Sequence, residues 1–419
     1  MTSASNPDLA TYRAEGREWL ASHVEAREPA ASSAVERWGV GDDDVSIFHD
    51  LSFEQEAELL ERAMKWQQTK FDAGYGAISW PGEYGGAGLP VEYERAFHEE
   101  ERAFQTPRRH ETFSVTVRLI APTVRLFGTE DQQARFVRRF LRAEELCCQL
   151  FSEPSAGSDL AGLGTRAVRD GDEWVVNGQK VWSSGARFAP WGELIARTDP
   201  AVPKHAGLSA FLVPMDAPGL EVRPIRQMSG GASFNGVFFT DVRLPDDLRL
   251  GDVGAGWKVA LTTLGFERGD NGAARAGGNW SQVHALARWL GVTDDRLVRD
   301  ALAELYTNHR ITDLVWQRAA RAADAGGVPG PEASIGKLRW TQDLTRTSDV
   351  VARLLGPRLA ADTGEWGTYS WTAHVLGAPG YRIAGGSDEI QRNIIGERVL
   401  GLPPEPRVDR DVPWRDVRR

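Results

Sequence analysis

Cysteine is almost absent from this 419-residue chain, which contains only Cys147 and Cys148. Two adjacent cysteines are poorly placed to form a structural disulfide with each other, so we expect no disulfide framework. The eight histidines are scattered, and they do not combine with the cysteines in a spacing that is typical of zinc sites. We therefore predict that the protein holds no metal.

An excess of positive charge and a long apolar run are missing as well. The 49 lysines and arginines are outnumbered by 59 aspartates and glutamates, which gives a formal net charge of -10. Nucleic-acid binders need basic patches that replace counterions, so the composition disfavours this class. The first residues resemble no signal peptide, and no later run is long and apolar enough to cross a bilayer. The sequence favours a cytoplasmic protein that binds neither nucleic acid nor membranes.

What the chain does contain is material for a large core, since 41% of its residues are hydrophobic. Apolar residues recur at helical spacing up to about Cys148, and again from about Gly256. Between these parts, short runs rich in valine, phenylalanine and tryptophan alternate with turn residues, which is typical of antiparallel strands. We predict an α+β fold with an N-terminal all-α domain (1–148), a central antiparallel β-domain (149–253) and a C-terminal helical bundle (254–419).

Two short motifs give sharper local predictions. Residues Thr129-Glu130-Asp131-Gln132 have the pattern of a capping box and predict the start of a helix. Asn177-Gly178 separates two runs that read as strands, and Asn-Gly tolerates the positive φ angles of a two-residue turn. We therefore predict a β-hairpin whose turn is Asn177-Gly178.

A stretch of small residues, Leu150–Asp159, joins the first helical part to the β part. Such a stretch can cradle a flavin or a phosphate with its backbone N–H groups and hydroxyls, although its composition alone favours a polar interdomain loop. It resembles the Thr-Glu-Pro-x-Ala-Gly-Ser-Asp signature of the acyl-CoA dehydrogenase family. Further motifs of that family follow or precede it in order: Trp80–Gly86, Gly178–Ala186, Gly254–Trp257, Glu267-Arg268 and Glu389–Arg398.

The resemblance covers essentially the whole chain and implies a fold and a reaction. The implied fold is the acyl-CoA dehydrogenase fold, whose C-terminal part is a four-helix bundle. The implied reaction is FAD-dependent oxidation of an acyl-CoA thioester to the trans-2-enoyl-CoA, in which a base takes the α-proton and the flavin takes the β-hydride. The implied cofactor-binding residues are Gln149, Ser152, Ser158, Trp182, Ser184 and Ser387, and the implied substrate-binding residues are Ser158 and Arg268. By its composition alone, Trp182 could equally be a tryptophan packed in the β core.

The position of the catalytic base departs from the commoner pattern of the family. Glycine, Gly385, stands where many members carry a catalytic glutamate. The resemblance implies that Glu267 replaces it, as in branched-chain members, and that the Gly385 N–H stabilises the developing enolate as an oxyanion hole would. Glu267 follows an apolar helical run, so a dry setting and a raised pKa are expected. The alternative is that Glu267 and Arg268 form a surface ion pair.

Two outer segments with which homotetrameric members complete a neighbour's FAD site are not intact. The first should lie within Gly277–Gly291, where its arginine cannot be placed. The second spans His374–Gly380, with His374 for a glutamine and Ala378 for a glycine. We predict a tetramer in which this chain is the base-bearing subunit of an α2β2 assembly with a paralogous subunit. The alternative is a homotetramer that holds FAD by other contacts.

Two other functions remain open beside the dehydrogenase. One is a flavin-dependent oxidase or monooxygenase on the same scaffold, and the other is a non-catalytic partner subunit that only completes another chain's FAD site. Family resemblance also implies an electron-transfer flavoprotein as the electron acceptor. The glycines Gly265 and Gly269, which flank Glu267, hint at a branched or polycyclic acyl group, such as a steroid side chain.

Overall fold

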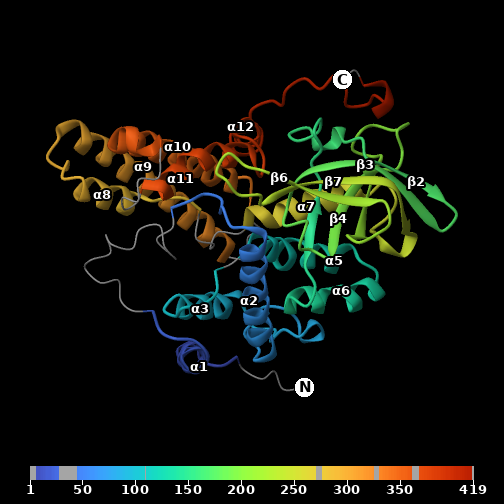
Figure 1. Cartoon of the computed structure of the whole chain (residues 1–419). Helices are drawn as coiled ribbons and strands as arrows, with labels where there is room; N and C mark the ends of the chain where they lie inside the picture. The colour runs from blue at the N-terminus through green and yellow to red at the C-terminus, as the bar shows by residue number, and fades with distance from the viewer. Residues whose placement is uncertain are drawn as a thin grey trace.

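The computed structural model describes residues 6–27, 45–108, 110–269, 276–324, 330–360 and 368–417. Helices occupy both ends of the chain and strands occupy its middle, so the predicted α+β order of helical, β and helical parts is confirmed (Figure 1). No helix within these ranges combines the length and the apolar character that crossing a membrane requires.

The N-terminal helices pack on one another and against one face of the sheet. A π-helical stretch at 115–120 precedes α5, and the predicted capping box opens α6: the Thr129 hydroxyl accepts from the Gln132 N–H, and the Gln132 side chain accepts from the Thr129 N–H. The helices of this part are α1 (Leu9–His23), α2 (Phe53–Asp72), α3 (Val91–Glu101), α4 (Glu111–Ser114), α5 (Ala121–Phe127) and α6 (Glu130–Arg142).

The strands form one sheet in the order β6-β7-β3-β2-β4-β5-β8, with β1 paired to β4. Most neighbours are antiparallel, but β1 runs parallel to β4 and places Gln149 opposite Glu193. The strands are β1 (Cys147–Leu150), β2 (Arg166–Asp170), β3 (Glu173–Ser184), β4 (Trp191–Arg197), β5 (Leu208–Pro214), β6 (Leu220–Ile225), β7 (Phe234–Pro245) and β8 (Arg249–Leu250).

The hairpin predicted at Asn177-Gly178 is wrong, because β3 continues through both residues. The turn lies earlier instead, at Gly171, whose φ of +64° is in the left-handed region, and it joins β2 to β3. A Cβ at Gly178 would lie 2.4 Å from the Thr165 hydroxyl, so the glycine permits a close approach rather than a turn. The Asn177 side chain pairs with Asp241 on β7.

The helices that follow the sheet are α7 (Gly256–Gly269), α8 (Trp280–Trp289), α9 (Arg296–Asp324), α10 (Ala333–Leu355), α11 (Thr368–Ile383) and α12 (Asp388–Ile394). Helix α7 lies under the sheet beside α5, and α8 to α11 form a bundle next to the sheet (Figure 1). Alternation along the strands divides the core: Cys147, Trp191 and Ile195 face α5, α6 and α7, whereas Cys148 and Leu194 belong to a second cluster.

Candidate active site

Trp182 is the most unusual side chain of the β-domain. It lies near the end of β3 with a left-handed φ of +62°, where the pairing of β3 with β7 shifts its register between Lys180 and Ser183. Its side chain is 56% exposed, and the edge of its ring meets Phe234 with centroids 5.9 Å apart. A strand tryptophan held outward at a conformational cost presents a free aromatic face. The alternative of a tryptophan packed in the β core is therefore wrong.

The loop that carries Ser152 is fixed against β3 beside Trp182. The Val181 N–H donates to the Ser152 carbonyl oxygen over 2.9 Å. Below it, the fully buried Lys180 ammonium donates to the Phe151 carbonyl at 2.9 Å and to the Glu153 carboxylate at 2.8 Å. The other Glu153 contacts are the backbone N–H groups of Gly164 and Thr165. This buried network holds the small-residue loop in one geometry.

The charges of this pair follow from its setting. Burial lowers the pKa of Lys180 to about 8, although the Glu153 carboxylate opposes the shift. Burial would raise the pKa of Glu153, but Lys180 and the two backbone donors outweigh it, so that this pKa lies below its ordinary value. The sequence analysis did not single out Lys180 or Glu153. A signal existed, because Lys180 shares the inward-facing positions of β3 with Trp174 and Val176.

Gln149 and Ser184 complete a group of predicted residues that lie on adjacent parts of the sheet. Gln149 is on β1, and its amide nitrogen is buried without a hydrogen-bond partner in the described parts of the chain. Ser184 ends β3 and is half-buried. We call Gln149, Ser152, Trp182 and Ser184 the Trp182 cluster. It offers an aromatic face, a vacant amide donor and two hydroxyls.

Glu111, at the start of α4, also reaches this cluster and was not predicted. Glu111 is an exposed residue, but protein atoms around its carboxyl group displace part of the surrounding water. This desolvation raises the pKa of the carboxyl. A hydrogen bond from Ser184 and the nearby His110 oppose the shift. Glu111 belongs to the N-terminal helical part and Ser184 to the sheet, so no local sequence motif contains both residues.

The remaining predicted site residues lie at different places. Ser158 is exposed on its loop, and the Ser387 hydroxyl caps α12 by accepting from the Ile390 N–H at 3.3 Å. Glu267 and Arg268 lie on α7, and only their backbone is described. Gly385 follows α11 with a left-handed φ of +62°, which favours glycine there, and its carbonyl accepts from Gln391.

The segment His374–Gly380 on α11, which we call the His374 segment, is closed by this chain's own residues. The His374 ring is fully buried, accepts from the Gly278 N–H at 3.1 Å and donates to the Leu344 carbonyl at 3.3 Å. Burial lowers its pKa to about 4, which keeps the ring neutral. The missing side chains of Gly377 and Gly380 leave room for Ile47 and Phe48, which approach to 2.6 and 2.8 Å of a built Cβ.

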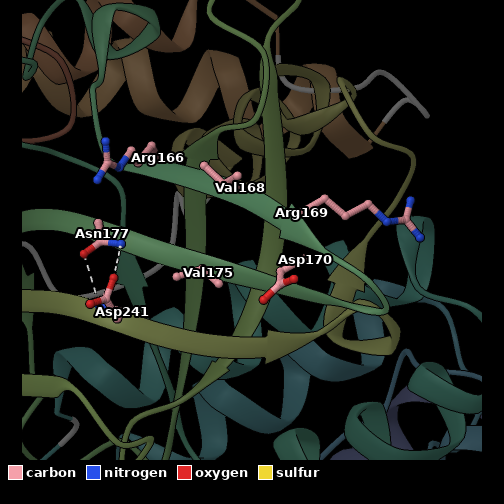
Figure 2. A pocket seen from close by; sticks show the side chains of 7 residues that line it. All are labelled: Arg166, Val168, Arg169, Asp170, Val175, Asn177 and Asp241. Carbon is pink, nitrogen blue, oxygen red and sulfur yellow. Dashed lines mark hydrogen bonds between the residues drawn. The ribbon is translucent and has the colours of Figure 1, made fainter.

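A surface hollow of about 420 Å³ lies elsewhere, on β2, β3 and the adjacent end of β7. Figure 2 shows that Asn177 and Asp241 satisfy each other there and that Arg166 and Arg169 extend away from one another. None of the predicted site residues lines it. The hollow is therefore not the candidate site.

Comparisons with known proteins identify the family. Family models of the acyl-CoA dehydrogenase N-terminal, middle and C-terminal domains match residues 49–144, 148–242 and 254–400. The chain belongs to the acyl-CoA dehydrogenase family. It is thus an oxidoreductase that acts on acyl-CoA, and it has the three-part fold of that family, as predicted.

Individual relatives match over nearly the full length. Acyl-CoA dehydrogenase IpdE1 of Mycobacterium tuberculosis is 39% identical over 402 residues, covering 95% of this chain and 99% of the relative. The solved structure titled "Tcur3481-Tcur3483 steroid ACAD" has a TM-score of 0.74 at 28% identity and covers 97% of this dehydrogenase and all of that chain. The ChsE4-ChsE5 complex from Mycobacterium tuberculosis has a TM-score of 0.69 at 26% identity, with 96% and 100% covered.

Proposed function

We propose that this acyl-CoA dehydrogenase binds FAD at the Trp182 cluster and oxidises a thioester with a bulky acyl group, such as a steroid side chain. The observation that carries the cofactor site is the outward Trp182 ring on β3, together with the buried amide donor of Gln149 on β1, which has no hydrogen-bond partner among the described residues. The substrate class is supported by the solved relative whose title calls it a steroid ACAD. Gly265, which precedes Glu267 on α7, has no atom within 4 Å of the position of a side chain and so leaves room there.

The residues of the cluster fit a flavin. An aromatic face can lie against a planar ring system, and the Gln149 amide and the hydroxyls of Ser152 and Ser184 can pair with the ring's carbonyls and nitrogens. Ser158 and Ser387 would contact the remainder of the cofactor, and Ser158 and Arg268 would bind the CoA part of the substrate. When bound, FAD supplies the electron acceptor for the β-hydride, which no side chain can provide.

Glu267 is the proposed base for the α-proton. The substrate's α-carbon loses a proton to the Glu267 carboxylate while the Gly385 N–H donates to the thioester carbonyl, where negative charge develops. The apolar helical residues before Glu267 would raise the pKa of its carboxyl once substrate excludes water. A glycine at 385 leaves the approach to this carbonyl clear of a second carboxylate.

Replacing Glu267 by glutamine tests this assignment directly. We expect turnover to fall by roughly a thousandfold, since general bases contribute on the order of 10²–10⁴ in rate. Flavin absorbance should persist while substrate no longer bleaches it. Glu221→Gln is the matched control, because Glu221 is an exposed glutamate that pairs with an arginine on β6 and should tolerate the same change. Unchanged turnover in Glu267→Gln would remove the assignment.

The assembly we propose is an α2β2 tetramer with a paralogous subunit, and an electron-transfer flavoprotein would accept the electrons. The support is that the His374 segment is filled by Ile47 and Phe48, so that it has little room for a neighbour's cofactor. Two solved relatives carry paired names of different chains. Expression of this chain alone and together with its paralogue tests the idea: full flavin occupancy and full thermal stability of the lone chain would contradict it.

A further inference from the structure

Glu193 is a buried carboxyl group that none of the roles above uses. It lies in the middle of β4, where every residue is buried, and its own exposed fraction is 0%. Glutamate is rarely buried without a partner, because removing a carboxylate from water is costly. Its position therefore calls for a specific explanation.

One oxygen of Glu193 is bound and the other is not. Oε1 accepts from the Thr263 hydroxyl of α7 at 2.8 Å, whereas Oε2 has no hydrogen-bond partner in the described parts of the chain. The Thr263 hydroxyl lies in turn 3.0 Å from that of Thr123 on α5. These contacts tie the middle of β4 to the helix that carries Glu267.

Glu193 is also the strand neighbour of Gln149. The parallel pairing of β1 and β4 sets the two residues opposite each other, so their side chains leave the sheet on the same face. Gln149 has an unpartnered amide nitrogen and Glu193 has an unpartnered oxygen. Thr263 precedes Glu267 by one helical turn and therefore shares its helix face. Glu193 thus contacts the helix that carries the proposed base and lies opposite a proposed flavin contact on β1.

No described cation faces Glu193. Burial raises the pKa of its carboxyl to about 8, and the Thr263 hydrogen bond opposes this only in part. The titratable group beside it on β1 is Cys147, whose thiol is kept neutral because burial raises its pKa well above the usual value. From α5 and α7 the groups that face it are the hydroxyls of Thr123 and Thr263, which carry no charge.

We propose that Glu193, in its uncharged form, is a positioning residue that couples helix α7 to strand β1. It accepts from Thr263 through Oε1 and donates from Oε2 to the Gln149 side-chain oxygen, which directs the Gln149 amide nitrogen toward the ligand. The proposal rests on the assignment of Glu267 and the Trp182 cluster. Ionisation of Glu193 removes its donor and sets a negative charge against Thr263, which precedes the proposed base by one helical turn, and a second charge near the base opposes proton abstraction.

The test compares Glu193→Gln, Glu193→Leu and Thr263→Val in the FAD-loaded assembly. Glu193→Gln keeps an acceptor for Thr263 and a donor for Gln149, so flavin reduction by substrate should stay within about twofold of the unmodified rate at neutral pH. Above a pH of about 8 the unmodified enzyme should slow, and this variant should lack that decline. Glu193→Leu and Thr263→Val should slow reduction by about tenfold at all pH values, as expected for one lost hydrogen bond.

Thr312→Val is the matched control, because Thr312 donates to the buried Asp343 in the C-terminal bundle in the same way. It should leave the flavin reduction rate and its pH profile unchanged. A second measurement needs no activity: the urea stability of the flavin-free protein. The unmodified chain should lose stability as pH rises from about 4.5 to about 8, because the folded state keeps a proton that the unfolded state releases. Glu193→Gln should lose less over this window.

Two results would overturn the proposal. One is an alkaline decline that Glu193→Gln retains in full, and the other is a Glu193→Leu variant that reduces flavin as fast as the unmodified enzyme. Either result, combined with an inactive Glu267→Gln, refutes the role of Glu193 while the proposed base survives. An active Glu267→Gln refutes the proposed base instead, whatever the Glu193 variants do.

Discussion

The Trp182 cluster and the His374 segment differ in whether their polar groups have partners and whether their space is filled. The cluster exposes an aromatic ring and keeps a buried amide donor without a partner. In the His374 segment the buried ring has partners on both nitrogens, and Ile47 and Phe48 fill the space above two glycines. Unpaired polar groups beside an exposed ring indicate a place for a ligand, whereas satisfied groups under apolar cover indicate a finished core.

This difference bears on whether the chain needs an unlike partner subunit. Among the described residues, the chain leaves an amide donor of the Trp182 cluster without a partner, yet it closes the segment which, by resemblance, homotetrameric relatives use for a neighbour's cofactor. Such a division supports the proposal of an unlike partner subunit better than simple loss of function would. The noncatalytic interpretation fits less well, because it predicts an intact outer segment.

Removing the anchor under the Trp182 cluster should have the largest effect. Lys180→Met leaves the Glu153 carboxylate buried without its cation, and breaking a buried ion pair in this way costs about 3–5 kcal/mol. Urea unfolding should show this loss, and FAD occupancy should fall with it because the Ser152 loop is released. Lys204→Met, which loses only contacts to the more exposed Asp159 and Asp409, is the control and should cost less than about 1 kcal/mol. Equal losses in both variants would contradict the role of the anchor.

Overfilling the His374 segment should have an intermediate effect. Gly377→Ala places a methyl group against Ile47, and overpacking of this kind costs about 1–3 kcal/mol of folding stability. Ile47→Gly should relieve the clash, because the Ile47 Cβ is the nearest atom to the new methyl group, so the double variant should be less destabilised than the sum of the two single variants. Fully additive losses would show that Ile47 does not cover the segment.

Removing the exposed ring should have the smallest effect, and one confined to binding. Trp182→Ala should weaken FAD binding by about tenfold, as expected for one aromatic contact, while the flavin-free protein keeps its unfolding midpoint. Trp182→Phe should retain most of the affinity. Flavin titration monitored by fluorescence measures both. A marked loss of stability in the flavin-free Trp182→Ala variant would mean that the ring belongs to the core.

Local sequence patterns predicted much of the fold. The capping box at Thr129 appears as expected, because it depends on interactions between residues close in the chain. The Asn177-Gly178 turn did not form. Gly178 is needed because Thr165 packs too close to allow a side chain there. Thr165 is distant in sequence, so a local pattern does not predict this contact.

The candidate site divides in the same way. Motif order supplied the residues that we group as the Trp182 cluster, of which Gln149 lies on β1, Trp182 and Ser184 lie on β3, and Ser152 lies on the loop after β1. Nothing local predicts that Glu111 reaches Ser184, or that Glu193 meets Thr263. The members of each pair come from segments far apart in the chain. Loss of water around the two carboxyl groups, which raises their pKa values, arises only in the folded protein.

The sequence by itself determined the family and the order of helical and β parts, because these depend on residue types in a fixed order, and it supplied the proposal that Glu267 replaces a base at Gly385. The tertiary structure decided which polar groups are left without partners and which spaces are filled. Burial and long-range packing set those outcomes, as when Ile47 covers α11 and when β4 carries Glu193 into the core.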